Sequence, residues 1–321
     1  MMTTMYWAKP DEKREIVEFC DYVFSKAHRP HDFKTLLPKL YGEQGDGAEH
    51  HFVVREDGKL MATVLVYPVV MYICGARFMT LGVGSVSTHP DARGRGYMKA
   101  LMDAVDQRAE TLQADFAVLG GQRQRYAYFG YDYGGYQMNA NLTACNVRHA
   151  LAACDAQAYT IEEMTKEHVA QAMQLHAAQP CFCERKPEAF EEILRSWNNR
   201  PFAVMENGVF AGYGTMRQNA DSCRIAELLL KDEACFPAVM KRLSSEKGDL
   251  TIAAAPWQKE RADWLSRTCE EFAVSPNYNY KIYHAERLRS VFSGLGGGNE
   301  SFVFHGFSLP LPLYIAPADA V

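Results

Sequence analysis

The chain has 321 residues, of which 48% are hydrophobic and 23% are charged, and its formal net charge is -5 at pH 7. A chain of this length predicts about two domains, and its apolar content can give each of them a core. The slightly acidic balance gives no reason to expect nucleic acid or an anionic membrane as the main partner. The composition therefore indicates an ordinary globular protein.

The nine cysteines do not have the spacing of a disulfide scaffold. A chain of this size does not need disulfides to fold, so we expect reduced thiols that lie mostly in the core. The N-terminus lacks the basic, apolar and small-residue regions of a secretion signal. No segment approaches the ~18 uninterrupted apolar residues of a membrane span, so the expected location is cytoplasmic.

The first 145 or so residues predict a mixed order of helices and strands. Apolar residues at helical spacing predict a helix over 11–27, and a second short helix is expected over 33–40. Asp57-Gly58 predicts a hairpin turn between two strands within 51–67. A strand over 78–88, a helix that buries one face from Met98 to Leu112, and a short strand at 116–119 follow.

The second half repeats this order. We expect a strand near Tyr159, helices over 167–178 and 187–197, a hairpin over 201–215 around Asn207-Gly208, a strand over 225–230, a helix over 235–245, and strands over 250–255 and near 279–284. The sequence therefore predicts an α/β fold, of the α+β mixed-sheet kind, in two related domains, 1–147 and 155–290. A glycine-rich hinge at 294–299 and a C-terminal tail complete the region 291–321, to which we assign a further strand.

One junction between a strand and a helix has the composition of an anion site. It reads Arg93-Gly-Arg-Gly96, and backbone N–H groups at a helix N-terminus are unpaired donors at the positive end of the helix dipole. The alternative is a surface loop with a solvated basic face. The matching junction of the second half, Lys231-Asp-Glu-Ala234, has no glycine and two acids, so it would repel an anion.

Spacing excludes two other phosphate-binding motifs. There is no Gly-x-x-x-x-Gly-Lys-Ser/Thr sequence, and Gly82-Val-Gly84 lacks the third glycine of the dinucleotide motif. No Gly-x-Ser-x-Gly segment supports serine hydrolysis.

The stretch from Val86 to Met98 resembles the acetyl-CoA motif of the GNAT family of N-acetyltransferases, Arg/Gln-x-x-Gly-x-Gly/Ala. Arg93 and Gly96 match this motif, and Met98 departs from it. Downstream, Tyr126-Ala-Tyr-Phe-Gly-Tyr131 resembles the family's Tyr-x-x-x-Gly-Phe/Tyr segment. Met98 and the second, motif-free unit resemble the Eis-type (enhanced intracellular survival) subgroup.

This resemblance is specific over 50–137 and architectural over 155–290. It implies tandem GNAT-like domains, the first active and the second degenerate. Members of the subgroup usually carry a third domain, whereas here only residues 300–321 follow the hinge.

The resemblance also implies how acetyl-CoA would bind, as a co-substrate and without a metal. Backbone groups of three strand residues would hold the pantetheine and the acetyl carbonyl, and backbone amides of the turn would hold the pyrophosphate. Arg123 and Arg125 are spare cations for the nucleotide phosphate, or solvated surface residues. The implied binding residues are Val86, Ser87, Thr88, Arg93, Gly94, Arg95, Gly96, Tyr97 and Met98.

Two catalytic roles follow from the resemblance. Tyr126 matches the tyrosine that protonates the leaving thiolate, and the alternative is one more aromatic residue in an aromatic-rich loop. The terminal carboxylate of Val321 matches the group proposed to deprotonate the amine, and the alternative is a frayed terminus. Glu18, Asp21 and Asp32 are other carboxylates for an amine, or solvated helix residues.

Other candidate sites are weaker. His176 with Cys181 and Cys183 has poor spacing for zinc, and we expect buried thiols instead. His50 and His51 are expected to be partly exposed.

The predicted function is acetyl transfer from acetyl-CoA to a primary amine of a small molecule or peptide. The alternative is a non-catalytic acyl-CoA-binding or regulatory protein. Neither nucleic acid nor a membrane is expected as a partner, and a homo-oligomer is left open.

Overall fold

The computed structural model describes residues 2–27, 29–220, 222–293, 302–304, 307–309 and 313–321, and the predicted hinge at 294–299 lies outside this part of the chain. The chain divides into two compact units. Unit 1 comprises the described residues within 1–133, 278–298 and 320–321, and unit 2 comprises those within 134–277 and 299–319. None of the described helices combines the length and the apolar character that crossing a bilayer requires.

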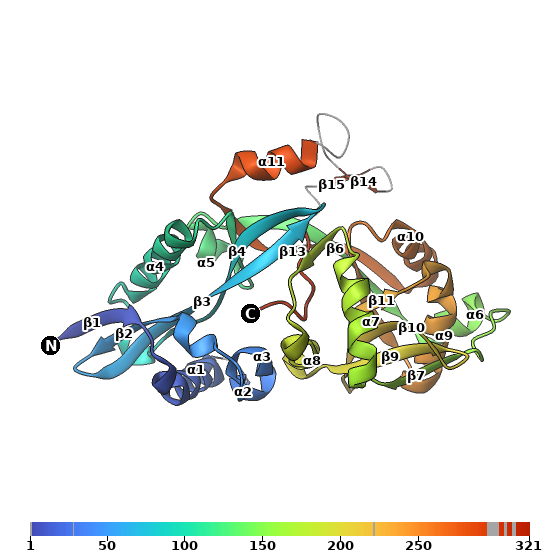
Figure 1. Ribbon diagram of the computed structural model, residues 1–321, viewed down its shortest axis with the longest axis horizontal. Helices are drawn as coiled ribbons and strands as arrows, with labels where there is room; N and C mark the ends of the chain where they lie inside the picture. Colours follow the sequence, from blue (N-terminus) through green and yellow to red (C-terminus); the bar gives the residue numbers. More distant parts are fainter. Residues whose placement is uncertain (1, 28, 221, 294–301, 305–306, 310–312) are drawn as a thin grey trace. The chain divides into compact units, whose positions relative to one another are not determined.

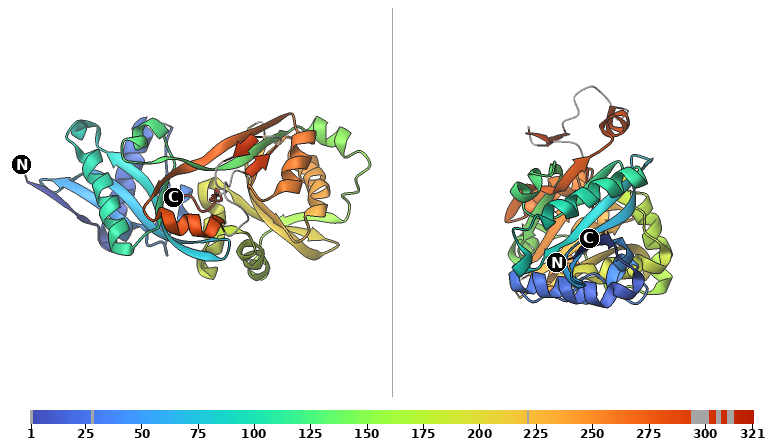
Figure 2. Two further views of the ribbon diagram at one scale, coloured as in Figure 1. Left: turned by 90° about the horizontal axis from the view of Figure 1, so that it is seen from above. Right: turned by 90° about the vertical axis from the view of Figure 1, so that its left-hand side faces the viewer.

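Unit 1 is a mixed sheet with helices on both faces (Figure 1). Helix α4 covers one face, and α1, α2 and α3 cover the other (Figures 1 and 2). Its elements are β1 (Thr3–Trp7), α1 (Lys13–Ala27), α2 (Phe33–Leu36), α3 (Pro38–Tyr41), β2 (His51–Glu56), β3 (Lys59–Ile73), β4 (Ala76–Thr88), α4 (Tyr97–Leu112), β5 (Phe116–Leu119), α5 (Arg123–Ala127), α11 (Ala285–Ser293) and the last residues of β13 (Glu271–Ile282).

The strands of unit 1 are antiparallel except for one pair. β1, β2, β3 and β4 pair in chain order, β5 lies parallel to β4, and β13 lies antiparallel to β5. The predicted hairpin joins β2 to β3, and Asp57 and Gly58 have the positive φ angles of 47° and 82° that this tight turn requires. The parallel pair matters most for function, because α4 connects its two strands.

After its first strand and helix, unit 2 follows an order of strands and helices similar to that of unit 1, with one additional short strand. Its elements are β6 (Asp132–Leu142), from Gly134 onward, α6 (Ala144–Ala150), β7 (Tyr159–Glu163), α7 (Lys166–Ala177), β8 (Cys181–Cys183), α8 (Phe190–Arg195), β9 (Arg200–Glu206), β10 (Val209–Gln218), β11 (Cys223–Leu230), α9 (Phe236–Lys247), β12 (Leu250–Ala254), α10 (Lys259–Thr268), the first residues of β13, β14 (Phe302–Phe304) and β15 (Phe307–Leu309).

The sheet of unit 2 has its own parallel pair, β11 with β12, joined through α9. β10 lies antiparallel to β11, β9 to β10 and β7 to β9. Alternate residues of β9 face opposite cores, since Phe202 and Val204 pack with α9 whereas Ala203 and Met205 pack with α7 and α8. β14 pairs only with β15 among the described strands.

The last strand of each unit comes from the other half of the chain. β6 follows α5 of unit 1 but pairs with β12 of unit 2, and β13 follows α10 of unit 2 but pairs with β5 of unit 1. The division between units therefore differs from the boundary that we predicted at 147–155. Strand propensity indicates that a segment is extended, but it does not indicate which strand the segment pairs with.

Several local predictions need correction. The helix expected over 33–40 is two short helices, because Pro38 interrupts the first one. β1 and β6 were missed. All nine cysteines are free, but only Cys20, Cys181, Cys183 and Cys223 are buried, so most of the thiols are not in the core.

Candidate functional site

β4 and β5 separate at one end of their parallel pairing. The register runs from Thr80 opposite Phe116 to Val83 opposite Leu119, where β5 ends. β4 continues to Thr88, still paired on its other side with β3. The residues of β4 beyond Val83 therefore have one edge without a partner in β5, and their backbone groups are available to a ligand.

A β-bulge lies within this unpaired part of β4. Leu65 of β3 is opposite Gly84, and Thr63 is opposite Ser87, so two residues of β4 face a single residue of β3. Ser85, inside the bulge, has a φ of 49°, which is uncommon for a residue other than glycine. The bulge changes the direction of the backbone at the predicted binding residues Val86 and Thr88.

The turn between β4 and α4 has the geometry of an anion site. Gly94 and Gly96 have φ angles of 79° and 80°, and a Cβ built on either would meet no atom within 4 Å. These glycines are therefore required by the backbone conformation and leave open space above the turn. Gly96 is the N-cap residue of the 16-residue helix α4, whose first N–H groups have no partner within the helix.

The three basic residues around this turn are placed differently. Arg93 is exposed and makes no ion pair with any residue that the structure describes. Arg95 instead binds both carboxylate oxygens of Glu56, at 2.8 and 2.6 Å, and Lys99 binds Asp103 at 2.6 Å. Arg93 is therefore the cation available to a bound phosphate, and Arg95 contributes its backbone only.

The first two residues of α4 anchor the helix to the sheet. The Tyr97 hydroxyl donates to Glu56, and the Met98 side chain packs against the core formed by β3, β4 and α4. Only their backbone amides are available to the turn. The core contact gives a structural reason for a bulky residue at Met98, where the GNAT motif has glycine or alanine.

Tyr126 lies at the end of β5, on the short helix α5. Its side chain is 7% exposed and packs directly on Gly121, where an added Cβ would lie 2.8 Å from the tyrosine ring. Burial raises the pKa of the Tyr126 phenol, with a smaller opposing effect from Arg125. The phenol is therefore protonated at neutral pH and can act as a proton donor.

Arg123 and Arg125 differ in their availability. The Arg123 guanidinium pairs with Asp132 at 2.5 and 3.1 Å and lies over the Tyr133 ring. Arg125 forms no ion pair with a described acidic residue and interacts with Tyr126. Of these two arginines, Arg125 is the one whose charge no described Asp or Glu side chain neutralises.

The carboxyl group of Val321 lies against β4. A Cβ built on Gly84 would lie 2.9 Å from the carboxyl carbon of Val321, and one on Gly82 would lie 2.6 Å from a methyl group of that residue. Lys39 of α3 donates a 2.7 Å hydrogen bond to the carbonyl of Ala320. The two glycines thus make room for Val321, which explains the Gly82-Val-Gly84 segment without a nucleotide.

Tyr126 and Val321 lie on opposite sides of the gap between β4 and β5. Leu81 and Val83 point into the same core as Tyr126, below α4. Side chains alternate along a strand, so Gly82 and Gly84 face the other side, where Val321 lies. A group placed in the gap would have the core that contains Tyr126 on one side and the Val321 carboxyl group on the other.

Residues 7–134 match the family model of the acetyltransferase (GNAT) domain. This part of the chain is therefore similar to a GNAT domain. The turn at 93–98, the gap between β4 and β5, and Tyr126 all lie within the matched residues. No curated protein sequence matches the chain.

Solved structures show the same fold at low sequence identity. A probable N-acyltransferase from Enterococcus faecalis is 16% identical with a TM-score of 0.68, over 88% of this chain and 72% of that chain. Eis1 from Mycobacterium abscessus is 14% identical with a TM-score of 0.63, over 90% and 76%. N-myristoyltransferase from Saccharomyces cerevisiae, with bound myristoyl-CoA, is 12% identical with a TM-score of 0.55, over 88% and 79%.

The other carboxylates that we considered for the GNAT domain have structural roles. Glu18 is exposed and lies 3.9 Å from Arg14. The Asp21 carboxylate accepts the Phe33 N–H at 2.7 Å, and Asp32 caps α2 by accepting the N–H of Thr35 at 3.1 Å. None of these contacts places a carboxylate at the gap.

The expectation for His51 was wrong. This residue is 0% exposed, because β2 is an internal strand of the sheet and its side chain lies below α3. His50, one residue earlier, is partly exposed as expected. His50 ends the short 3-10 helix Gly47–His50 and His51 begins β2, so the two adjacent histidines belong to different elements and differ in exposure.

Asn279 of β13 is a site residue that sequence reasoning missed. Its side-chain N–H₂ donates to the carbonyl oxygens of Leu119 and Gly121, at 3.4 and 3.1 Å. These carbonyls are at the end of β5, where β4 has diverged. Asn279 therefore helps to hold the segment on which Tyr126 packs, and only the pairing of β13 with β5 could have indicated it.

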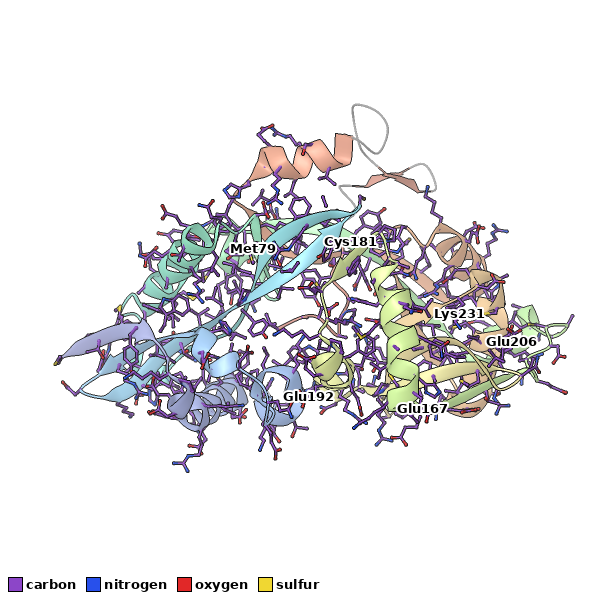
Figure 3. All side chains as sticks on the ribbon, in the orientation of Figure 1. Met79, Glu167, Cys181, Glu192, Glu206 and Lys231 are labelled. Carbon is purple, nitrogen blue, oxygen red and sulfur yellow. The ribbon has the colours of Figure 1, made fainter. Side chains whose placement is uncertain are left out.

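The described junction of β11 and α9 in unit 2 lacks the features of the anion site. At the junction of β11 and α9, Asp232 accepts the Ala234 N–H at 2.9 Å and Glu233 binds the buried Arg261. Lys231, labelled in Figure 3, donates to Gln171 at 2.9 Å. This junction presents carboxylates and no glycine, as the sequence predicts.

The end of the β11–β12 pairing in unit 2 is lined by the C-terminal tail. The pairing stops at Ile225 opposite Ile252, and the pocket beyond it is lined by Leu228, Ala253 and Tyr314. Arg185 binds two buried carboxylates that line this pocket. Its partners are Glu227, at 2.9 and 2.7 Å, and Asp319, at 2.8 and 2.9 Å.

The alternative metal site in unit 2 is not formed. No group of three or more His, Cys, Asp or Glu side chains in the described residues could hold a metal ion. The His176 ring bonds the backbone carbonyl of Cys183 at 2.7 Å, and both cysteines are buried and form no disulfide.

Proposed function

We propose that the protein is an N-acetyltransferase of the Eis type that transfers the acetyl group of acetyl-CoA to a primary amine. The observation that carries the proposal is the gap between β4 and β5, which has the glycine turn of α4 nearby and the Tyr126 phenol and the Val321 carboxyl group on its two sides. Acyltransfer needs an acyl donor, a proton acceptor for the amine and a proton donor for the leaving thiolate.

The donor would bind along β4. Backbone N–H groups of residues 93–98 and the Arg93 guanidinium would hold the pyrophosphate, since a helix N-terminus favours an anion. Backbone groups of Val86, Ser87 and Thr88 would hold the pantetheine and the acetyl carbonyl in the gap. Binding in this way would place the thioester beside the bulge of β4.

The acceptor amine would arrive on the face where Val321 lies. Most alkylamines are protonated at neutral pH, with a pKa of ~10.4, so the amine needs a base. The Val321 carboxylate accepts its proton, and the nitrogen lone pair forms a bond to the carbonyl carbon. This role requires that the chain end at Val321, which an extended variant tests directly.

Collapse of the tetrahedral intermediate breaks the carbon–sulfur bond and leaves the electron pair on sulfur. Tyr126 then gives its hydroxyl proton to the thiolate, and the second proton of the amine nitrogen, released as the amide forms, passes through water to the phenolate. The proton on the Val321 carboxyl group leaves to solvent. The products are an N-acetylated amine and free coenzyme A, and the atoms balance without a metal or a redox step.

We assign unit 2 as a degenerate GNAT-like domain without a donor of its own. The repeated order of elements supports the assignment, as does the acidic junction at 231–234. The assignment is also supported by the C-terminal tail, whose residues line the pocket at the end of the β11–β12 pairing.

Consumption of the thioester with a panel of amines tests the proposal. Acetyl-CoA is offered with aminoglycosides, polyamines, other small primary amines and peptides, and free thiol and acetylated amine are measured together. The proposal expects amine-dependent release of thiol in equal amount to acetylated product. Binding of acetyl-CoA without thiol release for any amine would favour the non-catalytic alternative instead.

A further inference from the structure

A buried chain of hydrogen bonds ends at the bulge of β4, and the mechanism above does not use it. The Ser85 hydroxyl lies 3.0 Å from the Tyr41 hydroxyl, which lies 2.8 Å from His51 Nε2. His51 Nδ1 lies 2.8 Å from the Thr63 hydroxyl, and that hydroxyl donates to the Phe52 carbonyl at 3.0 Å. All five residues belong to unit 1.

Only one direction of donation satisfies every member of this chain. The Phe52 carbonyl can only accept, so the Thr63 hydroxyl donates to it and accepts from His51 Nδ1–H. Burial lowers the pKa of His51 to about 3, so the ring is neutral and its Nε2 is an acceptor. The Tyr41 hydroxyl therefore donates to Nε2, and it must accept the hydroxyl hydrogen of Ser85.

The direction of the chain excludes a proton relay and favours a positioning role. It ends on a backbone carbonyl, which cannot take up a proton. At the other end, it holds a serine whose φ of 49° is unfavourable for a side-chain-bearing residue. The hydrogen bond of the buried Ser85 hydroxyl can offset the cost of this φ angle. In any other backbone conformation the hydroxyl would lose that partner, and a buried hydroxyl without a partner is penalised.

We propose that the chain Ser85–Tyr41–His51 positions the acyl-transfer centre by holding the bulge of β4. This inference rests on the proposed function. Ser85 lies directly after Gly84, against which the Val321 carboxyl group lies, and directly before Val86, which is expected to hold the acetyl carbonyl. A change of backbone conformation at Ser85 moves both groups relative to the thioester. The phosphate turn at 93–98 is outside the bulge, so binding of the pyrophosphate does not depend on the chain.

Tyr41→Phe tests this role, because it leaves the Ser85 hydroxyl and His51 Nε2 without their partner and keeps the ring. We expect kcat to fall by roughly ten-fold or more, since small misplacements of reacting groups are costly, while the KM for acetyl-CoA changes little. The matched control is Tyr67→Phe on β3, which removes a hydroxyl that donates to Asp46 in the segment before β2. This control should retain the kcat of the wild type.

The deciding experiment is a rescue. Glycine adopts positive φ freely, so Ser85→Gly in the Tyr41→Phe background should keep the bulge without any hydrogen bond and recover most of kcat. A merely structural role of Tyr41 predicts no such recovery. An unchanged kcat in Tyr41→Phe, or a lost kcat that Ser85→Gly does not restore, would overturn the proposal.

Hydrogen exchange separates this proposal from the proposed function. The amides of 84–88 should exchange faster in Tyr41→Phe than in the wild type and the Tyr67→Phe control, whether or not an acceptor amine has been found. If the wild type releases no thiol with any amine, the proposed function fails. Unchanged exchange at 84–88 would then still decide against the positioning chain.

Discussion

Acid should destabilise unit 1 because His51 is buried and neutral. Burial lowers its pKa from 6.5 to about 3 in the folded protein. Between these values the unfolded chain binds a proton that the folded chain does not, so the unfolded state is favoured as the pH falls. The contribution of His51 to the free energy of unfolding is therefore fully present above pH 6.5, and it is lost progressively as the pH falls to about 3.

The magnitude follows from the difference between the two pKa values. At about pH 5, roughly 1.5 units below the pKa of the unfolded histidine, proton binding stabilises the unfolded state by ~2 kcal/mol. The folded state gains almost nothing, because the pKa of its histidine lies well below this pH. Urea unfolding of the wild type and of His51→Gln at about pH 7.5 and about pH 5 measures this quantity. All other titrating groups are common to both proteins, so their effects cancel in the comparison.

We expect the wild type to lose ~2 kcal/mol more than His51→Gln between the two pH values. The absolute stability of the variant does not enter, because each protein is compared with itself. An equal loss in both proteins would show that His51 titrates normally. That result would also remove the basis for the direction of the hydrogen-bond chain.

Three further predictions concern other parts of the structure. Gly96→Ala should raise the KM for acetyl-CoA, because alanine at a φ of 80° is strained by roughly 1–2 kcal/mol and disturbs the anion turn. Gly84→Ala should lower kcat, because its Cβ would displace the Val321 carboxyl group, and extending the chain beyond Val321 should do the same. Arg185→Leu should lower the free energy of unfolding by roughly 3–5 kcal/mol in urea, since it leaves two buried carboxylates unpaired.

Matched variants make these three predictions decisive. Gly58→Ala imposes the same strain in the β2–β3 turn, at a φ of 82°, and should leave the KM for acetyl-CoA unchanged. If it raises that KM as much as Gly96→Ala does, the anion turn has no special role. Arg195→Leu removes an exposed ion pair with Glu191 and should cost well under ~1 kcal/mol. Full activity in both the Gly84→Ala and extended proteins would exclude Val321 as the base.

Much of the fold could be predicted because its signals are local. Asp57-Gly58 and Asn207-Gly208 mark the two hairpins, and all four residues have the positive φ angles that such turns need. The apolar spacing after Met98 identified α4. The mixed α/β class, with a parallel pair joined by a helix in each half, follows from these elements in order.

What could not be predicted depends on contacts between segments that are distant in sequence. The sequence analysis missed β6 and found only the end of β13, and the exchange of their pairing partners is set by tertiary packing. Asn279 reaches the end of β5 only because of this exchange. The approach of Val321 to Gly84 and the burial of His51 below α3 also bring together residues with no local pattern in common.

The two motifs at the site were more informative than their individual residues. The turn at 93–98 and Tyr126 were predicted from their resemblance to the GNAT motifs, and the structure places them beyond the ends of adjacent parallel strands. The side chains around the turn were not predictable, because Arg95 pairs with Glu56 of β2 while Arg93 stays exposed. The availability of a charge depends on neighbours that the motif does not contain.

The central claim is that Tyr126 protonates the thiolate in an N-acetyltransferase, and one comparison tests it most directly. Tyr126→Phe and Tyr128→Phe remove the same hydroxyl from the same loop, but Tyr128 is 80% exposed and lies outside the core that holds Tyr126. We expect Tyr126→Phe to lower amine-dependent thiol release by roughly ten-fold or more while acetyl-CoA still binds, and Tyr128→Phe to match the wild type. Equal turnover in the wild type and in Tyr126→Phe would contradict the account.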